Sequence, residues 1–137
     1  MQPYIHTVQY YETDRMRITH HSNYIRWMEE ARMELLNRLD WPIERLEEMG
    51  IFIPVVAVDF RFKHTTTSSE RISITVSVAK WTGIRMVLAY EMRKEDGTLA
   101  GTGTTEHCFL DREGRIIRLQ REYAELYQAI LPLLPHT

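Results

Sequence analysis

The first 50 residues change their hydrophobic period once, from two residues to about 3.6. Between residues 4 and 12 a period of two predicts a strand whose inner face carries Tyr4, His6, Val8 and Tyr10. From residue 24 the apolar positions recur three or four residues apart. They predict a mostly buried helix with Tyr24, Met28, Ala31, Leu35 and Leu39 on its inner stripe. We expect Ser22 or Asn23 to cap this helix, and a second, short helix to start at Pro42 and end at Gly50.

After Gly50 the period of two returns. It predicts three half-buried strands, over residues 56–62, 72–78 and 86–92. The connections between the later strands are short, which favours antiparallel neighbours.

The segment Thr98–Leu110 is rich in threonine and glycine and predicts a further strand. Gly101 and Gly103 within it indicate either a β-bulge or the close approach of another backbone. A last helix is expected over residues 123–130, ended by Pro132.

The predicted order is strand, long helix, four strands, short helix, and it indicates an α+β fold in a single domain of residues 1–137. We expect a five-stranded antiparallel sheet wrapped around one long central helix, because a helix with so broad an apolar face needs a sheet to cover it. One helix leaves a sheet edge and a face open, so edge-to-edge dimerisation is expected.

Composition and charge exclude several classes of protein. The formal net charge of −2 gives no basic bias, so nucleic acid is not an expected partner. A single cysteine, Cys108, rules out an intrachain disulfide and a cysteine-rich zinc site. The histidines show no metal-ligand spacing, and we expect no bound metal. No apolar run approaches the roughly 18 residues of a membrane span, so a cytoplasmic location is expected.

The candidate chemistry lies between the first strand and the long helix. Asp14 follows the strand, and His20 and His21 stand six and seven residues later, at the start of the helix. A carboxylate near a helix N-terminus is suited to act as a base or nucleophile beside an anion site. The simpler alternative is a loop carboxylate that only closes the turn at Thr13.

These residues carry a family resemblance. Tyr-x-Glu-Thr-Asp at residues 10–14 followed by His-His-Ser-Asn-Tyr-Ile-Arg-Trp-Met-Glu-Glu-Ala-Arg at 20–32 resembles the opening of hotdog-fold acyl-CoA thioesterases of the 4-hydroxybenzoyl-CoA thioesterase type. Further similarity follows at residues 53–56, 80–81, 95–97 and 104–107, so the resemblance covers nearly the whole chain.

The resemblance implies a single hotdog domain and the hydrolysis of an acyl-CoA or an acyl-carrier protein to a free acid and a thiol. It implies that Asp14 is the catalytic carboxylate and that the backbone N–H of His21 is the oxyanion contact. Such a donor is worth roughly 3 kcal/mol of transition-state stabilisation. Asn23, Tyr24 and Arg17 are the expected substrate-binding residues. No cofactor is expected, since coenzyme A is part of the substrate, and the family suggests a homodimer or homotetramer.

Some features leave alternatives open. Arg17 stands where the family usually has glycine, and it either narrows the pocket or brings a cation to it. This favours, as an alternative function, a non-catalytic acyl-CoA-binding or regulatory protein. Glu29 is a rival base, because another branch of the fold uses a helix glutamate, or else it pairs with Arg32 on the helix surface. Four cations near strand ends either meet coenzyme A phosphates or are solvated: Arg61, Lys63, Lys80 and Arg85.

Overall fold

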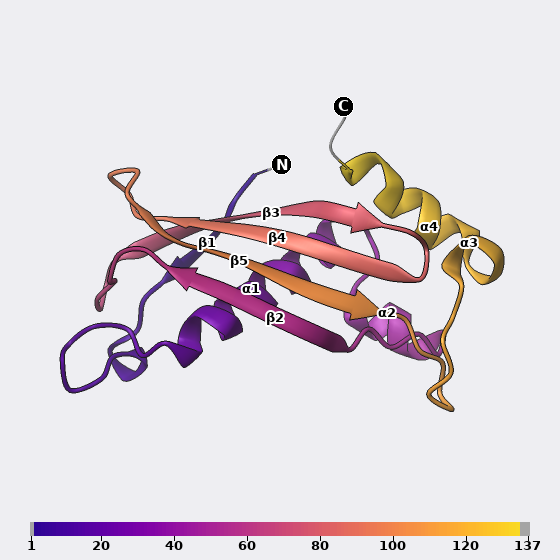
Figure 1. Ribbon diagram of the computed structural model, residues 1–137, viewed down its shortest axis with the longest axis horizontal. Coiled ribbons are helices and arrows are strands. Elements are labelled where there is room, and N and C mark those ends of the chain that lie inside the picture. Colours follow the sequence, from indigo (N-terminus) through magenta and orange to yellow (C-terminus); the bar gives the residue numbers. More distant parts are fainter. Residues whose placement is uncertain (1, 135–137) are drawn as a thin grey trace. The chain divides into compact units, whose positions relative to one another are not determined.

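The structure is a computed structural model that describes residues 2–134, and the chain divides into two compact units. The first unit comprises Met1–Glu34, Asp59–Val76 and Tyr90–Gly103, and the second comprises Leu35–Val58, Ser77–Ala89 and Thr104–Thr137. Figure 1 labels the helices and strands along the chain. They are β1 (Tyr4–Thr7), the 3₁₀ turn η1 (Tyr10–Glu12), α1 (Ser22–Arg38), α2 (Ile43–Glu48), β2 (Val55–Phe62), β3 (Arg71–Trp81), β4 (Arg85–Arg93), β5 (Leu99–Cys108), α3 (Leu119–Glu122), α4 (Ala124–Ile130) and the 3₁₀ turn η2 (Leu131–Leu133).

The five strands form one antiparallel sheet in the order β1-β3-β4-β5-β2, which confirms the α+β class and the five-stranded sheet predicted from the sequence. Strand β1 pairs antiparallel with β3, with Tyr4 opposite Ile74 and Thr7 opposite Arg71. The predicted alternation holds throughout β4, where Met86, Leu88, Tyr90 and Met92 are buried, and in β3 it buries Ile72, Ile74 and Val78 but leaves Val76 half-buried.

Strand β2 lies at an edge of the sheet and differs from its prediction as half-buried. Its sequence alternates, but nearly all of its residues are exposed, among them Val56 at 57% and Val58 at 45%. An edge strand pairs with another strand on one side only. An alternating sequence therefore does not guarantee that its apolar side chains are buried in a single copy of the chain.

In the first unit, the opening turns of α1 supply the core. Trp27 and Met28 are fully buried, and the Tyr24 ring lies 5.1 Å from the Phe60 ring of β2. A Cβ added to Gly103 would lie 2.6 Å from the Met28 sulfur and 3.0 Å from the Asp59 carbonyl oxygen. The glycines of β5 therefore mark a close approach of another backbone, one of the two predicted explanations.

In the second unit, aromatic side chains join the end of β3 to the C-terminal helices. The Trp81 ring lies 5.3 Å from Phe109 and 5.6 Å from Tyr127, and its indole nitrogen donates to the Tyr127 carbonyl oxygen. Helix α4 matches the helix expected over residues 123–130, whereas α3 was not predicted.

The first strand is shorter than its period of two predicts. Strand β1 ends at Thr7, and Tyr10 is 83% exposed in the turn that follows. The chain turns because the Gln9 N–H donates to the Glu12 carboxylate and the Glu12 N–H donates back to the Gln9 carbonyl oxygen. The strand therefore ends because a carboxylate three residues ahead binds the backbone. The alternation of apolar and polar residues does not predict such a contact.

The predicted helix cap is also wrong. Helix α1 already includes Ser22 and Asn23. The Ser22 N–H donates instead to Nδ1 of His20 at 3.3 Å, and the Asn23 side-chain amide donates to the carbonyl oxygens of Glu12 and His20. The cap therefore comes from a histidine ring two residues before the position expected.

Candidate active site

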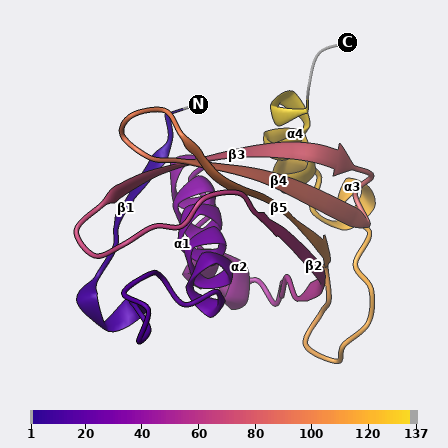
Figure 2. The ribbon, with the colours of Figure 1, turned by 60° about the vertical axis from the view of Figure 1, so that its left-hand side comes forward.

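Asp14 lies on the loop between β1 and α1, whose course Figure 2 shows, and hydrogen bonds of the backbone close this loop into a turn. The Asp14 N–H donates to the Ile18 carbonyl oxygen, and the Arg17 N–H donates to the Asp14 carbonyl oxygen, each at 2.9 Å. One carboxylate oxygen of Asp14, Oδ1, accepts from the Met16 N–H at 2.8 Å. Arg17 has a φ of 65°, in the left-handed region that favours glycine. The bond to Met16 fixes one carboxylate oxygen, and within residues 2–134 no hydrogen bond holds the other.

The start of α1 leaves one backbone donor available. The rings of His20 and His21 stack with centroids 4.2 Å apart. Within the part of the chain that the structure describes, the His21 N–H donates no hydrogen bond. Since the N-terminus of a helix carries a partial positive charge, this N–H suits an oxygen on which negative charge develops.

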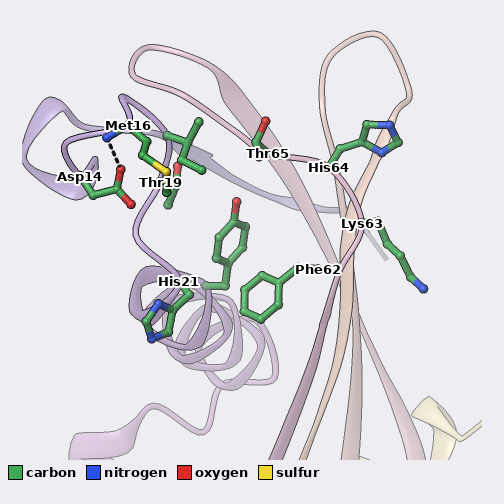
Figure 3. A pocket seen from close by; sticks show the side chains of 10 residues that line it. Asp14, Met16, Thr19, His21, Phe62, Lys63, His64 and Thr65 are labelled. Carbon is green, nitrogen blue, oxygen red and sulfur yellow. Dashed lines mark hydrogen bonds between the residues drawn. The ribbon is translucent and has the colours of Figure 1, made fainter.

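Asp14 and His21 line the same pocket, of about 370 Å³. Figure 3 shows Asp14 and Met16 on the loop, His21 at the start of the helix, and Phe62, Lys63, His64 and Thr65 on the facing segment. Ile18, Thr19 and Tyr24 complete the lining. The pocket therefore combines a carboxylate, a helix N-terminus and an aromatic wall.

The facing segment bends at the end of β2. The N–H groups of Lys63 and His64 both donate to the Ala100 carbonyl oxygen, at 2.9 and 3.1 Å. Two residues opposite one is the arrangement of a β-bulge, which bends the strand that carries it. All four residues from Phe62 to Thr65 then contribute to the lining, which a regular strand with alternating sides would not do.

Three buried hydroxyls join the helix to both sides of the pocket. The Tyr24 hydroxyl lies 3.0 Å from Oγ1 of Thr66, and Oγ1 of Thr19 is bonded to the same Thr66 hydroxyl. Thr66 is 1% exposed. Because its hydroxyl is engaged, Tyr24 offers the pocket mainly its ring, which meets Phe62 edge-on at 5.3 Å.

Two residues before Asp14 lies a buried carboxylate. Glu12 is 6% exposed and accepts hydrogen bonds from the Gln9 N–H, the Trp27 indole and the His6 ring. Burial alone would raise the pKa of Glu12, but these hydrogen bonds outweigh it and hold the pKa below its usual value. Tyr4 lies on the outer side of this network, where burial and its hydrogen bond to Glu30 raise its pKa to about 12.

The structure brings three of the five predicted site residues together. Asp14, His21 and Tyr24 line the pocket, whereas Asn23 and Arg17 do not. The Asn23 side-chain amide donates to the Glu12 carbonyl oxygen and so holds the loop. Arg17 contributes backbone groups, since its carbonyl oxygen accepts from the Thr67 hydroxyl at 2.7 Å.

The structure also distinguishes among the other candidates, which are the rival base Glu29 and the four cations near strand ends. The Glu29 side chain is 64% exposed, lies 3.8 Å from Arg32 and is absent from the lining. Among the four candidate cations Lys63 lines the pocket, while Arg61 pairs with Asp59 and Arg85 pairs with Glu106.

Sequence reasoning missed His64 and Thr65 as pocket residues, together with the network around Glu12. The bulge gives no local signal in the sequence, but Glu12 is the glutamate of the Tyr-x-Glu-Thr-Asp motif, and its position there was a usable signal. Among residues 2–134, no cluster of three or more His, Cys, Asp or Glu side chains suits a metal ion. No described helix has the length and hydropathy needed to span a membrane.

Comparisons with known proteins agree with one another. A family model described as the thioesterase-like superfamily matches residues 8–133. A protein of Aquifex aeolicus, provisionally named an esterase, is 29% identical over 123 residues, which cover 90% of this chain and 94% of that protein. YneP of Bacillus subtilis, provisionally named an acyl-CoA thioesterase, is 28% identical over 123 residues, covering 89% of each chain. The solved structure of the DHNA-CoA thioesterase from Staphylococcus aureus superposes with a TM-score of 0.91 at 30% identity, covering 96% of this chain and 89% of that one.

Proposed function

Because the chain belongs to the thioesterase-like superfamily, we propose that it hydrolyses an acyl thioester of coenzyme A to a free acid and a thiol. Its relatives support coenzyme A as the thiol: YneP carries the name of an acyl-CoA thioesterase, and the Staphylococcus aureus enzyme acts on DHNA-CoA. An acyl-carrier protein is the second thiol carrier to test.

One observation carries this function. Asp14 and His21 line one pocket, with a carboxylate oxygen of Asp14 and the His21 N–H both outside the hydrogen bonds of the described chain. A thioester carbonyl that accepts from the His21 N–H has its oxygen polarised by that donor and by the helix dipole. Its carbon is then open to attack from the side of Asp14.

Asp14 acts in one of two ways, and each is balanced in atoms and protons. As a nucleophile, its carboxylate oxygen bonds to the carbonyl carbon, the C–S bond breaks and the thiolate leaves; water then opens the mixed anhydride. As a general base, Asp14 takes a proton from water, the hydroxide adds to the carbonyl carbon, and the departing thiolate recovers the proton. In both cases the negative charge of the tetrahedral intermediate lies on the oxygen at His21.

The proposal also includes the domain organisation and the assembly of the protein. The whole chain forms one hotdog domain in which the sheet wraps around α1, and two copies associate through the exposed edge strand β2. A dimer of such dimers gives the tetramer. Coenzyme A enters beside Lys63, the candidate cation that lines the pocket.

The test is thiol release from a panel of aliphatic and aromatic acyl-CoAs, DHNA-CoA included. The Asp14→Asn variant keeps an oxygen for the Met16 N–H but loses the negative charge, so kcat falls about 100-fold or more. Asp96→Asn is the matched control, because the Asp96 carboxylate accepts from the N–H two residues ahead in the same way and lies outside the pocket lining. Unchanged turnover in Asp14→Asn contradicts the assigned role of Asp14.

The alternative, a binding or regulatory protein without catalysis, was suggested by Arg17. Its side chain is exposed and outside the pocket lining, so it gives no ground for a blocked site. Calorimetry separates the two functions: tight acyl-CoA binding with no thiol release over hours supports the binding protein and contradicts hydrolysis.

A further inference from the structure

Glu12 connects three elements of the first unit through its carboxylate, although it lies outside the pocket lining. Oε1 accepts from the Gln9 N–H at 2.8 Å and lies 2.8 Å from Nε2 of His6 in β1. Oε2 accepts from the Trp27 indole of α1 at 2.7 Å. A carboxylate has acceptor sites only, so each of these three groups meets the partner it requires.

The backbone of Glu12 holds the other end of the loop. Its carbonyl oxygen accepts from the His20 N–H at 2.8 Å and from the Asn23 side-chain amide at 2.9 Å. Segment 13–21 therefore leaves Glu12 and returns to it. This segment contains Asp14, two residues after Glu12, and His21, one residue after His20.

His6 lies between two carboxylates. Its Nε2 faces Glu12 and its Nδ1 lies 3.0 Å from Glu30, while its ring stacks on Trp27 with centroids 4.5 Å apart. Each ring nitrogen bonds an ionised carboxylate only as a donor, because such a carboxylate has acceptor sites alone. A hydrogen bond to an ionised carboxylate is charge-assisted, which makes the contact between Glu12 and His6 shorter and stronger than a neutral one.

We infer that Glu12 is a positioning residue for the Asp14–His21 pair and that His6 holds its carboxylate in place. This role rests on the proposed function, since positioning matters only if Asp14 and His21 act together on a thioester. Catalytic groups displaced by about 1 Å lose roughly 100-fold in rate, so a residue that fixes both ends of their segment influences kcat without touching substrate.

The main variant is Glu12→Gln. An amide presents one acceptor and one donor group, and its NH₂ must face a donor among Gln9, Trp27 and His6. Thiol release is measured well below the Tm of each variant, so that unfolding does not reduce the number of active sites. We expect kcat to fall by roughly ten- to 100-fold with KM within about threefold of wild type, because positioning affects the reacting groups more than binding.

Glu70→Gln is the matched control. Glu70 forms the same kind of turn, with its carboxylate accepting from the Thr67 N–H at 2.8 Å and its own N–H donating back to the Thr67 carbonyl oxygen. Its carboxylate also pairs with Lys94, and among the described residues it forms no hydrogen bond or ion pair with segment 13–21. We expect Glu70→Gln to leave kcat and KM at wild-type values and to lower Tm less than Glu12→Gln does, because the Glu70 side chain is 28% exposed.

His6→Phe provides a second variant if Glu12→Gln does not fold. The phenyl ring preserves the stack on Trp27 but donates to neither carboxylate, and Glu12 keeps its bonds to Gln9 and Trp27. A several-fold fall in kcat at constant KM supports the role of His6. Wild-type kcat in a folded Glu12→Gln or His6→Phe, or an equal fall in Glu70→Gln, overturns the positioning role alone. Absence of thiol release from wild type overturns the proposed function, and the positioning role with it.

Discussion

Arg17 is strained in its backbone rather than crowded in its side chain. Its φ of 65° brings Cβ close to the backbone, at a cost of about 1–2 kcal/mol for a residue other than glycine. The loop needs this geometry, since the Arg17 N–H and carbonyl oxygen bond Asp14 and Thr67. The glycine usual at this position in the resembled family is therefore explained by the turn.

The effect of a substitution at Arg17 on the unfolding free energy should depend on how well the new residue tolerates a positive φ. Arg17→Val adds a β-branched side chain at positive φ, and we expect it to lower the unfolding free energy by about 1–2 kcal/mol relative to Arg17→Gly. Arg17→Gly itself should stay within about 1 kcal/mol of wild type, since relief of strain is offset by a more flexible unfolded chain. Urea unfolding measures both.

Arg15→Val is the control, because Arg15 is exposed in the same loop without a positive φ. It should change the unfolding free energy by less than about 0.5 kcal/mol. Equal values for Arg17→Val and Arg17→Gly contradict the strain explanation.

At the scale of elements, the glycines of β5 let β2 come close. A Cβ on Gly101 would lie 2.7 Å from the Arg61 carbonyl oxygen and would overlap the Phe60 ring. Backbone cannot move aside as a flexible side chain can, so an added methyl must separate the strands or shift the ring.

Gly101→Ala should therefore lower the unfolding free energy by about 1–3 kcal/mol, the usual cost of overpacking. Thr102→Ala, between the two glycines and half-buried, is the control and should cost less than about 1 kcal/mol. Thermal or urea unfolding of both variants gives the comparison. Stability in Gly101→Ala equal to that of the control shows that the strands have room for the methyl group.

The elements predicted from the sequence are those in which one buried face produces a regular pattern of apolar residues. Strands β3 and β4 bury one face: Ile74 alternates with the polar Ser73 and Thr75, and Leu88 alternates with the half-buried Val87 and Ala89, so both strands were predicted. The end of β1 was not, because a contact between Gln9 and Glu12 overrode an alternation that continued to Tyr10. Asp14 and His21 were predicted through a motif of fixed spacing. His64 and Thr65 were missed as pocket residues because their place depends on a bulge opposite Ala100, a residue far along the chain.

At the scale of the whole molecule, the two edges of the sheet differ. Edge strand β2 exposes Val55, Val56, Val58 and Phe62, each between 45% and 57%. Unpaired backbone groups beside apolar side chains invite pairing with another chain. This supports the proposed association of two copies along β2.

Val56→Lys places a charge in that association, and we expect it to convert the oligomer to a smaller species in light scattering at micromolar concentration. Ile5→Lys is the matched control on β1, where Ile5 is 40% exposed at the opposite edge of the sheet, and it should leave the mass unchanged. A monomeric wild type, or dissociation by Ile5→Lys instead, contradicts association through β2.

The histidine cap of α1 determines a tautomer. Nδ1 of His20 accepts from the Ser22 N–H at 3.3 Å and lies 2.9 Å from the Ser22 hydroxyl, which can also donate to it, so both bonds form when the ring proton is on Nε2. A proton on Nδ1 would turn that acceptor into a donor, and the Ser22 N–H would lose its partner. The turn that presents the His21 N–H is thus tied to which nitrogen of the neighbouring ring carries the proton.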